Sequence, residues 1–152
     1  MARLEETLTT ELPADEAFAF VADFANAEQW DPGVAWSRAV TNGPPEVGSR
    51  YLLGVRIGRG VTEMEYDITV LEPGRRVVLN GRGGQVSAVD DIRFEPLVTG
   101  TRIDYRADIE LHGWLRLVAP LAGRAFGNVA RNARNGMQRA LDARASIRTV
   151  VA

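Results

Sequence analysis

Six segments in which apolar and polar residues alternate follow one another between residues 34 and 111, separated by short turns. Successive side chains of a strand point to opposite faces of a sheet, so this period of two predicts strands. The expected strands cover residues 35–41, 49–57, 61–71, 76–81, 86–95 and 101–112. Turns such as Pro73-Gly74 and Thr99-Gly100 are too short for crossovers. The pattern therefore predicts a meander of mostly antiparallel neighbours.

Different patterns flank this run of strands. At the N-terminus, one further strand is expected from an alternation, Leu4, Glu6, Leu8, Thr10 and Leu12 against Arg3, Glu5, Thr7 and Thr9. After Pro13, residues 14–24 have helical periodicity, and a second short helix is expected over residues 26–30. The last third keeps one helical stripe over residues 115–145. Pro120 predicts that the long helix starts or kinks there, because proline has no backbone N–H to donate.

The composition excludes several classes of protein. A chain of 152 residues fits one domain, and we expect residues 1–152 to form it. Without cysteine there is no disulfide scaffold, thiol nucleophile or cysteine-bound zinc, and a single histidine allows no multi-histidine site. The longest uninterrupted apolar run covers residues 17–22, far short of the ~20 residues that cross a bilayer. The first residues lack an apolar signal core, so we expect a cytoplasmic protein.

Charge is distributed unevenly. All 18 basic residues are arginine, which suggests GC-rich codon usage and a bacterial source. Residues 115–152 carry a net charge of +6, and the preceding 114 residues carry −8. A basic C-terminal segment can meet nucleic acid or an anionic membrane. The alternative, a helix with an arginine-rich polar face packed on an acidic body, is favoured because no aromatic residues interleave with the charges.

Local motifs along nearly the whole chain, residues 4–142, resemble the START-like superfamily, and within it the polyketide cyclase and dehydrase branch. The motifs that carry the resemblance are Leu12-Pro13-Ala14-Asp15-Glu16-Ala17-Phe18, Trp30-Asp31-Pro32-Gly33-Val34, Val47-Gly48-Ser49-Arg50-Tyr51, Val70-Leu71-Glu72-Pro73-Gly74-Arg75-Arg76, Phe94-Glu95-Pro96 and Gly100-Thr101-Arg102. The resemblance implies an α+β helix-grip fold, with a curved antiparallel sheet of about seven strands around a long C-terminal helix. Two short helices follow the first strand, and an internal hydrophobic cavity lies between sheet and helix. These motifs are turns and packing residues, so they indicate fold more than chemistry.

Strand parity indicates which polar side chains face the hollow. Glu63, Glu65 and Asp67 alternate with the apolar set of their strand, so we expect them on the solvent face. His112 has the outward parity of the last strand, which makes a catalytic role unfavourable. Asp90 is the exception, because it shares the parity of apolar neighbours. A carboxyl group in an apolar hollow must find a partner or hold a proton, as a general acid or base does.

The partner of Asp90 stays open at this stage. The candidates are Arg82, Asn80, Arg38 and Arg56, and the parity of residues 76–81 is ambiguous. A capping or ion-pair role for Asp90 is the structural alternative to catalysis.

Aromatic and other large side chains are spread along the chain so that they can line a hollow from several sides. The candidate ligand-binding residues are Trp30, Trp36, Tyr51, Met64, Tyr66, Phe94, Tyr105, Trp114 and Phe126. Core packing is the competing interpretation for each of them. Small residues on the terminal helix, Ala119, Ala122, Gly123, Ala125 and Gly127, leave room for a ligand or for close approach to the sheet.

Two functions from different classes fit these features. The first is binding, transport or sensing of a hydrophobic small molecule such as a lipid, polyketide or isoprenoid. The second is a polyketide cyclase or aromatase, with Asp90 as acid and base and Tyr66, Tyr105 or an inward arginine polarising a carbonyl. A weaker third is docking of the arginine-rich helix to a membrane or partner. We expect no metal or cofactor, no nucleic acid, no stable membrane insertion, and a monomer or homodimer. The glycine-rich loop Gly81-Arg82-Gly83-Gly84 joins two strands and opens no helix, so we do not interpret it as a phosphate-binding loop.

Overall fold

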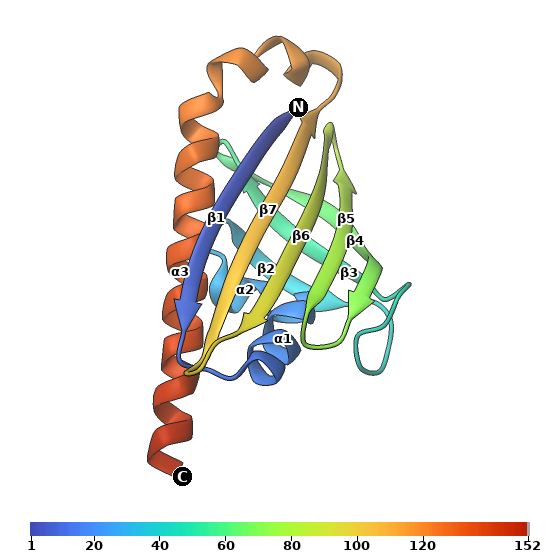
Figure 1. Ribbon diagram of the computed structural model, residues 1–152. Helices are drawn as coiled ribbons and strands as arrows, with labels where there is room; N and C mark the ends of the chain where they lie inside the picture. Colours follow the sequence, from blue (N-terminus) through green and yellow to red (C-terminus); the bar gives the residue numbers. More distant parts are fainter. Residues whose placement is uncertain (152) are drawn as a thin grey trace.

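A computed structural model describes residues 1–151 and confirms the expected α+β fold. One strand is followed by small helices, six more strands and a long helix (Figure 1). The strands are β1 (Ala2–Thr10), β2 (Val34–Ala39), β3 (Arg50–Ile57), β4 (Gly60–Glu72), β5 (Arg76–Gly83), β6 (Val86–Pro96) and β7 (Thr101–Leu111). The α-helices are α1 (Ala14–Ala22), α2 (Ala27–Trp30) and α3 (Gly123–Val151), and the 3-10 helices are η1 (Phe24–Asn26), η2 (Gly113–Leu117) and η3 (Ala119–Leu121).

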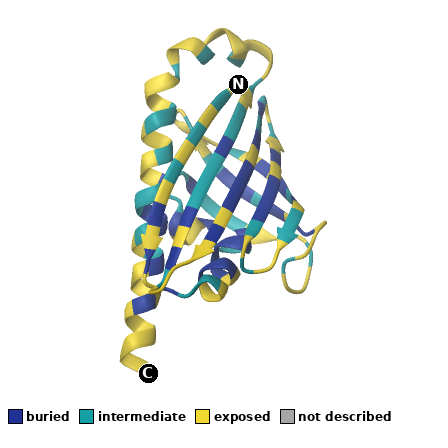
Figure 2. Ribbon diagram, viewed as in Figure 1, coloured by how far each residue is buried: buried dark blue, intermediate teal, exposed yellow. Residues whose placement is uncertain are grey.

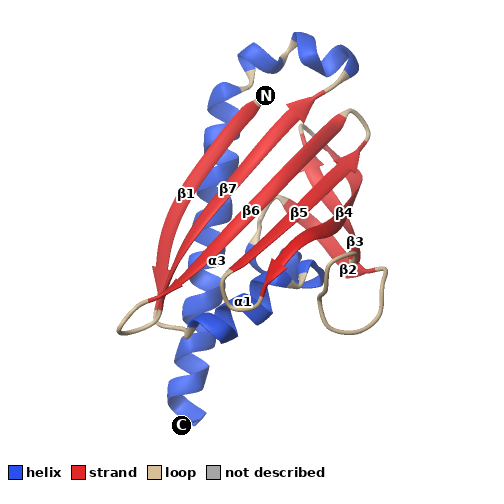
Figure 3. Cartoon of the chain, turned by 45° about the vertical axis from the view of Figure 1, so that its right-hand side comes forward, coloured by secondary structure: helices blue, strands red, loops and turns tan. Residues whose placement is uncertain are grey.

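The seven strands form one antiparallel sheet in the order β1-β7-β6-β5-β4-β3-β2. Six of the strands, β2 to β7, follow one another as the expected meander, and β1 closes the far edge by pairing with β7. Figures 1 and 3 show that the sheet curves, with α1, α2 and α3 on its concave side. Register shifts in β2 and β4 interrupt the regular pairing. A strongly curved sheet leaves space on its concave side that helices and side chains must fill.

The expected first helix divides into two pieces. The helix α1 ends at Ala22, and η1 begins after Asp23, whose carboxyl oxygen Oδ1 accepts a hydrogen bond from the Ala25 backbone N–H at 3.1 Å. Such a local side-chain acceptor competes with helix continuation. This break turns Phe24 and α2 toward the sheet. The apolar side chains between positions 14 and 24 therefore do not lie on one continuous helix.

The long helix begins later than its apolar stripe. As the position of Pro120 predicts, the chain passes through η2 and η3 before α3 starts at Gly123. The small residues at this end do not mediate close approach, since an added Cβ at Gly123 or Gly127 would meet no atom within 4 Å. Close approach occurs at Gly136, where a Cβ would collide with the backbone oxygen of Trp30. The glycine that packing requires is therefore in the middle of α3.

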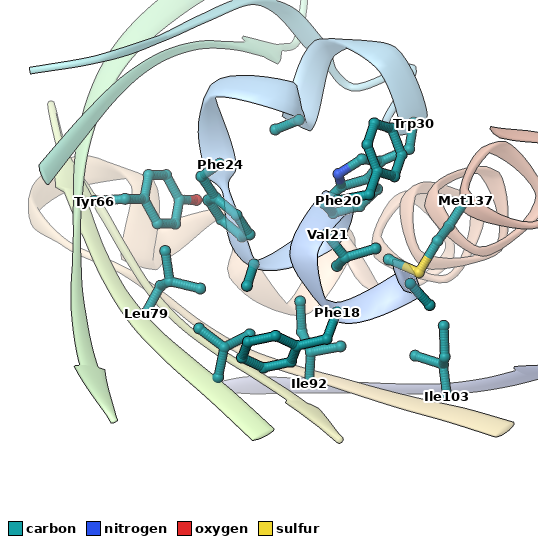
Figure 4. Packing of buried hydrophobic residues seen from close by; sticks show 14 of the residues in the cluster. Phe18, Phe20, Val21, Phe24, Trp30, Tyr66, Leu79, Ile92, Ile103 and Met137 are labelled. Carbon is teal, nitrogen blue, oxygen red and sulfur yellow. The ribbon is translucent and has the colours of Figure 1, made fainter. Parts of the chain in front are cut away.

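The core lies between the sheet, α1, α2 and the middle of α3, as the burial colours in Figure 2 show. Phe18 of α1 packs edge-on against Phe94 of β6, with ring centroids 5.3 Å apart. Met137 of α3 (Figure 4) is fully buried in the same cluster, and so is Leu141. The first turns of α3 are largely exposed. The space between sheet and helices is therefore closely packed around α1 and less completely filled by side chains toward η2 and η3.

Several arginines of α3 contact the acidic body. Arg148 pairs with Glu16 at 3.1 Å, and the Arg144 guanidinium lies 3.7 Å from the centroid of the Phe20 ring. These contacts agree with an arginine-rich polar face packed on the body. Among residues 1–151, no helix combines the length and apolar character that crossing a membrane requires.

Candidate ligand-binding cavity

A cavity of about 110 Å³ lies between the concave face of the sheet and α3. Its wall is mostly apolar and includes Phe24, Leu53, Val55, Ile109 and Met137. A second, more open hollow of about 380 Å³ adjoins it under η3 and shares Ile109 with it. The enclosed part is smaller than the ~150 Å³ cavity that holds benzene, so a guest with an aromatic ring would also extend into the second hollow.

Asp90 is the most deeply buried ionisable group on this wall. As parity predicts, β6 turns its side chain to the same face as Ala88 and Ile92, and the residue is 5% exposed. Within residues 1–151, its carboxyl oxygen Oδ1 accepts one hydrogen bond, from the Tyr105 hydroxyl at 3.0 Å, and no donor reaches Oδ2. Burial raises the pKa of Asp90 to about 7, although the Tyr105 hydrogen bond opposes this effect. The carboxyl group is thus poised to exchange a proton near neutral pH.

Two phenols accompany Asp90. Tyr105 lies on β7 beside β6, and Tyr66 lies on β4 across the concave face. Burial, and next the charge of Asp90, raises the pKa of both tyrosines well above the usual value. Both hydroxyl groups therefore stay protonated and can donate hydrogen bonds. Tyr66 requires Gly81 on the next strand, where a Cβ would collide with its ring.

Asp31 is a cavity residue that the sequence analysis did not single out, although it stands in the Trp30-Asp31-Pro32-Gly33-Val34 motif. Its Oδ1 accepts the Gly33 backbone N–H at 2.8 Å, which fixes the turn between α2 and β2. Its side chain also lines the cavity, and desolvation raises its pKa. The charges of Asp31 and Asp90 both raise the pKa of Tyr66 and of Tyr105, so the two carboxyl groups influence the same part of the cavity.

Aromatic rings surround the polar groups. The Trp30 ring lies edge-on to Tyr105, with centroids 6.1 Å apart, and edge-on to Phe24 at 6.0 Å. Phe24 also contacts Tyr66, with ring centroids 5.4 Å apart (Figure 4). The Trp30 indole nitrogen Nε1 is buried and has no hydrogen-bond partner in the described chain. An unpaired buried donor is costly, so a guest with an acceptor or a trapped water would be stabilised there.

The structure brings only part of the predicted set to this cavity: Trp30, Tyr66, Asp90 and Tyr105 line it. Tyr51, Met64 and Phe94 are buried in the core and do not line the cavity. Three others lie outside the enclosed cavity. Trp36 covers Gly54 and, like Gly54, has the parity opposite to Leu53 and Val55. Trp114 in η2 is 64% exposed, and Phe126 lines the second hollow. Strand ends and the start of the helix were the positions where periodicity carried least information.

The sequence leaves the partner of Asp90 open among four candidates. None of the four candidates reaches it: Arg82, for example, lies 3.6 Å from Asp67 on the outer face, and Asn80 is exposed. The inward set of β5 is Val77, Leu79 and Gly81, which settles the ambiguous parity. Tyr105 is the partner because the two side chains share the concave face of adjacent strands.

The remaining polar predictions concern the outer face. Glu63 and Glu65 are exposed and Asp67 is half-buried beside Arg82, as expected for a solvent face. His112 is exposed, and its Nε2 lies 2.8 Å from the Ser87 hydroxyl oxygen. Within residues 1–151, no three acidic or histidine side chains are grouped to hold a metal ion.

A curved antiparallel sheet around a long C-terminal helix, with an apolar cavity between them, defines a START-like helix-grip protein. The sequence of residues 1–145 matches the family described as polyketide cyclase / dehydrase and lipid transport, and the chain belongs to that family. Its fold is thus the hydrophobic ligand-binding fold of the family. No curated protein sequence matches the chain.

Solved structures with low sequence identity have the same fold. The Zhui aromatase/cyclase from a Streptomyces species is similar with a TM-score of 0.76 and 16% identity, over 97% of this chain and 95% of that one. A START superfamily protein from Mycobacterium smegmatis gives a TM-score of 0.72 and 18% identity, over 93% and 95%. A Thermus thermophilus protein gives 0.75 and 13%, over 93% and 98%. At these identities the likeness establishes the fold alone.

Proposed function

We propose that this protein binds a small hydrophobic molecule in the cavity between the sheet and α3. The observation that carries the proposal is an apolar, largely enclosed cavity in which Asp90 keeps one carboxyl oxygen without a partner. Such a combination, apolar walls with few polar groups, is the usual form of a small-molecule site. The START-like family and its lipid-transport description support the same function.

The test is native mass spectrometry of freshly purified protein, followed by solvent extraction. We expect a discrete added mass that extracts as an apolar compound. Filling the cavity by Ala88→Phe should abolish the added mass, because Ala88 lines the wall. The control is Val89→Phe on the opposite, solvent-facing side of the same strand, which should leave it unchanged. Equal retention by both variants would contradict binding in this cavity.

A cyclase or aromatase activity is the second candidate, and the Asp90–Tyr105 pair favours it. A carboxyl group with a pKa of about 7 can take a proton from carbon and return it to a leaving hydroxyl group. Tyr66 would donate a hydrogen bond to the carbonyl oxygen on which charge develops. The cavity of about 110 Å³ is small for a folded polyketide, so such a substrate would also have to occupy the adjoining hollow.

Asp90→Asn separates the two candidates. If the protein is an enzyme, Asp90→Asn should lower turnover of a poly-β-keto substrate by at least ~100-fold, since general acid–base catalysis contributes about that much or more. Binding of the substrate should remain, because asparagine keeps the shape of the side chain. Normal turnover by Asp90→Asn would remove the enzymatic role of this residue.

A further inference from the structure

The ionisable groups on the cavity wall are almost all acids. Among residues 1–151 they are Glu6 on β1, Asp31 after α2, Tyr66 on β4, Asp90 on β6, Tyr105 on β7 and a single base, Arg134 on α3. This composition does not favour an anionic ligand such as a fatty acid or a phosphate, since the wall offers a single cation and its carboxylates would repel the negative charge.

The single base is already engaged at the seam between β1 and α3. Its Nε donates a hydrogen bond to the Thr7 carbonyl oxygen at 2.9 Å and lies 3.9 Å from Glu6. Its Nη1 donates to the Asn135 side chain at 3.0 Å. Arg134 therefore offsets Glu6 at the rim and leaves the inner carboxyl groups without a counter-cation.

The inner carboxyl groups have acceptor capacity to spare. Tyr105 satisfies one oxygen of Asp90, and the Gly33 N–H satisfies one oxygen of Asp31. Aromatic rings border the same space, and the Trp30 ring centroid lies 6.0 Å from that of Phe24 and 6.1 Å from that of Tyr105. Aromatic faces attract cations, and the attraction grows when the cation is desolvated.

We propose that the ligand is a small hydrophobic amine, with its ammonium group at Asp90 and Asp31 and its apolar part against Trp30, Phe24 and Met137. This inference rests on the proposed binding function and specifies its ligand class. An ammonium group supplies the donors that both carboxyl groups lack, and the aromatic rings stabilise its charge. A carboxylate of the same size would find only neutral donors there, and the ionised forms of Asp31 and Asp90 would repel it, which is unfavourable.

Binding of an amine should be linked to a proton on Asp90. A positive charge within hydrogen-bond distance favours the ionised carboxyl group, so the pKa of Asp90 falls in the complex. The groups that face Asp90 are Tyr105, Tyr66 and Asp31, and the charge of Asp31 raises the pKa of Asp90 before binding. As the pH is raised toward 7, affinity for the amine should therefore increase by up to ~10-fold per pH unit. Above pH 7, where Asp90 is already ionised, affinity should level off.

The experiment compares three probes of nearly equal size: benzylamine, benzyl alcohol and benzoate. Dissociation constants are measured by isothermal titration calorimetry at pH 7.5, with NMR shifts of the Trp30 indole resonance reporting the site. We expect benzylamine to bind at least ~10-fold more tightly than benzyl alcohol, and benzoate to bind least. Asp90→Asn and, separately, Asp31→Asn should remove most of this preference. Asp67→Asn, on the outer face, should leave it unchanged.

The outcomes distinguish this inference from the function on which it rests. Benzyl alcohol binding as well as or better than benzylamine would overturn the amine assignment and keep the cavity as a binding site. A preference for benzylamine that survives in both Asp90→Asn and Asp31→Asn would also overturn it. If none of the three probes shifts the Trp30 resonance and the purified protein carries no apolar compound, the binding function itself fails.

Discussion

Asp90 and Asp91 are neighbours on β6, and both are only 5% exposed, yet the fold gives them opposite environments. Asp90 faces the concave side and has one neutral partner, the Tyr105 hydroxyl. Asp91 faces the convex side, where Arg76, Arg93 and Arg106 all lie within 3.4 Å of its carboxyl oxygens. Burial raises the pKa of Asp90 to about 7. Burial also acts to raise the pKa of Asp91, but the hydrogen bonds and charges of Arg76 and Arg93 outweigh it and lower that pKa.

The difference between the two residues shows that burial alone does not set the role of a carboxyl group. A buried carboxylate surrounded by guanidinium groups is a structural ion pair, whereas a buried carboxyl group with spare acceptor capacity is available to a ligand or a proton. The side of the strand decides between these roles, because adjacent residues point to opposite faces.

The largest effect should come from Asp90→Asn, through the pH dependence of folding. The folded pKa of about 7 exceeds the value of about 3.9 in an unfolded chain. The native state therefore holds an extra proton between these values, so stability falls as pH rises from ~4 to ~7. Asp90→Asn should remove a cost that reaches the order of 4 kcal/mol above pH 7. Urea unfolding at pH 5 and pH 8 measures it; parallel pH profiles of the two proteins would contradict the raised pKa.

Asp91→Asn should have the opposite sign. It leaves three arginines around a neutral side chain, so we expect a loss of about 2–3 kcal/mol at pH 7. The stability that the Asp91 carboxylate provides is present above pH ~4 and is lost at lower pH, since its folded pKa is depressed. Urea unfolding at pH 7 measures the loss, and Asp108→Asn, which removes the more exposed pair with Arg3, is the control and should cost less. Equal losses of stability in Asp91→Asn and Asp108→Asn would show that three arginines around a buried carboxylate stabilise the fold no more than one exposed ion pair does.

Sequence reasoning reached Asp90 because parity along a regular strand is a local property. The same reasoning placed Glu63 and Glu65 on the solvent face. It did not identify Tyr105 as the partner of Asp90, because the pairing register of β6 and β7 depends on the tertiary fold. It did not select Asp31. The turn that contains Asp31 is a local feature, but its side chain reaches the cavity only because α2 packs against the sheet.

Tertiary packing also explains the aromatic candidates that do not line the cavity. Trp114 follows the end of β7, and the chain leaves the sheet there in η2. Phe126 fits the helical stripe, but the first turns of α3 do not lie on the core. A helical period predicts which face is apolar, and it does not predict how far along the helix that face is covered.

Tyr105→Phe tests the one hydrogen bond that Asp90 has. We expect a loss of about 1–2 kcal/mol at pH 8, where the carboxyl group is ionised, and a smaller loss at pH 5. The pKa of Asp90 should rise further, because the Tyr105 hydrogen bond lowers it. The carboxyl ¹³C shift of Asp90, followed by NMR across pH 5–9, measures this directly. Tyr66→Phe is the control. If the titration midpoint of Asp90 moved in Tyr66→Phe and not in Tyr105→Phe, Tyr66 and not Tyr105 would be the hydrogen-bond donor.

The smallest effect separates the arginines around Asp91. Arg76 makes two hydrogen bonds to it at 3.0 Å and is mostly covered, whereas Arg93 makes contacts of 3.4–3.5 Å and is more than half exposed. Solvent screens the exposed pair, so we expect Arg76→Ala to cost about 1 kcal/mol and Arg93→Ala a few tenths. The difference between them should shrink in ~1 M salt, where the Debye length is ~3 Å. Equal costs for Arg76→Ala and Arg93→Ala in low salt would mean that the fixed geometry of Arg76 is not what holds Asp91 ionised.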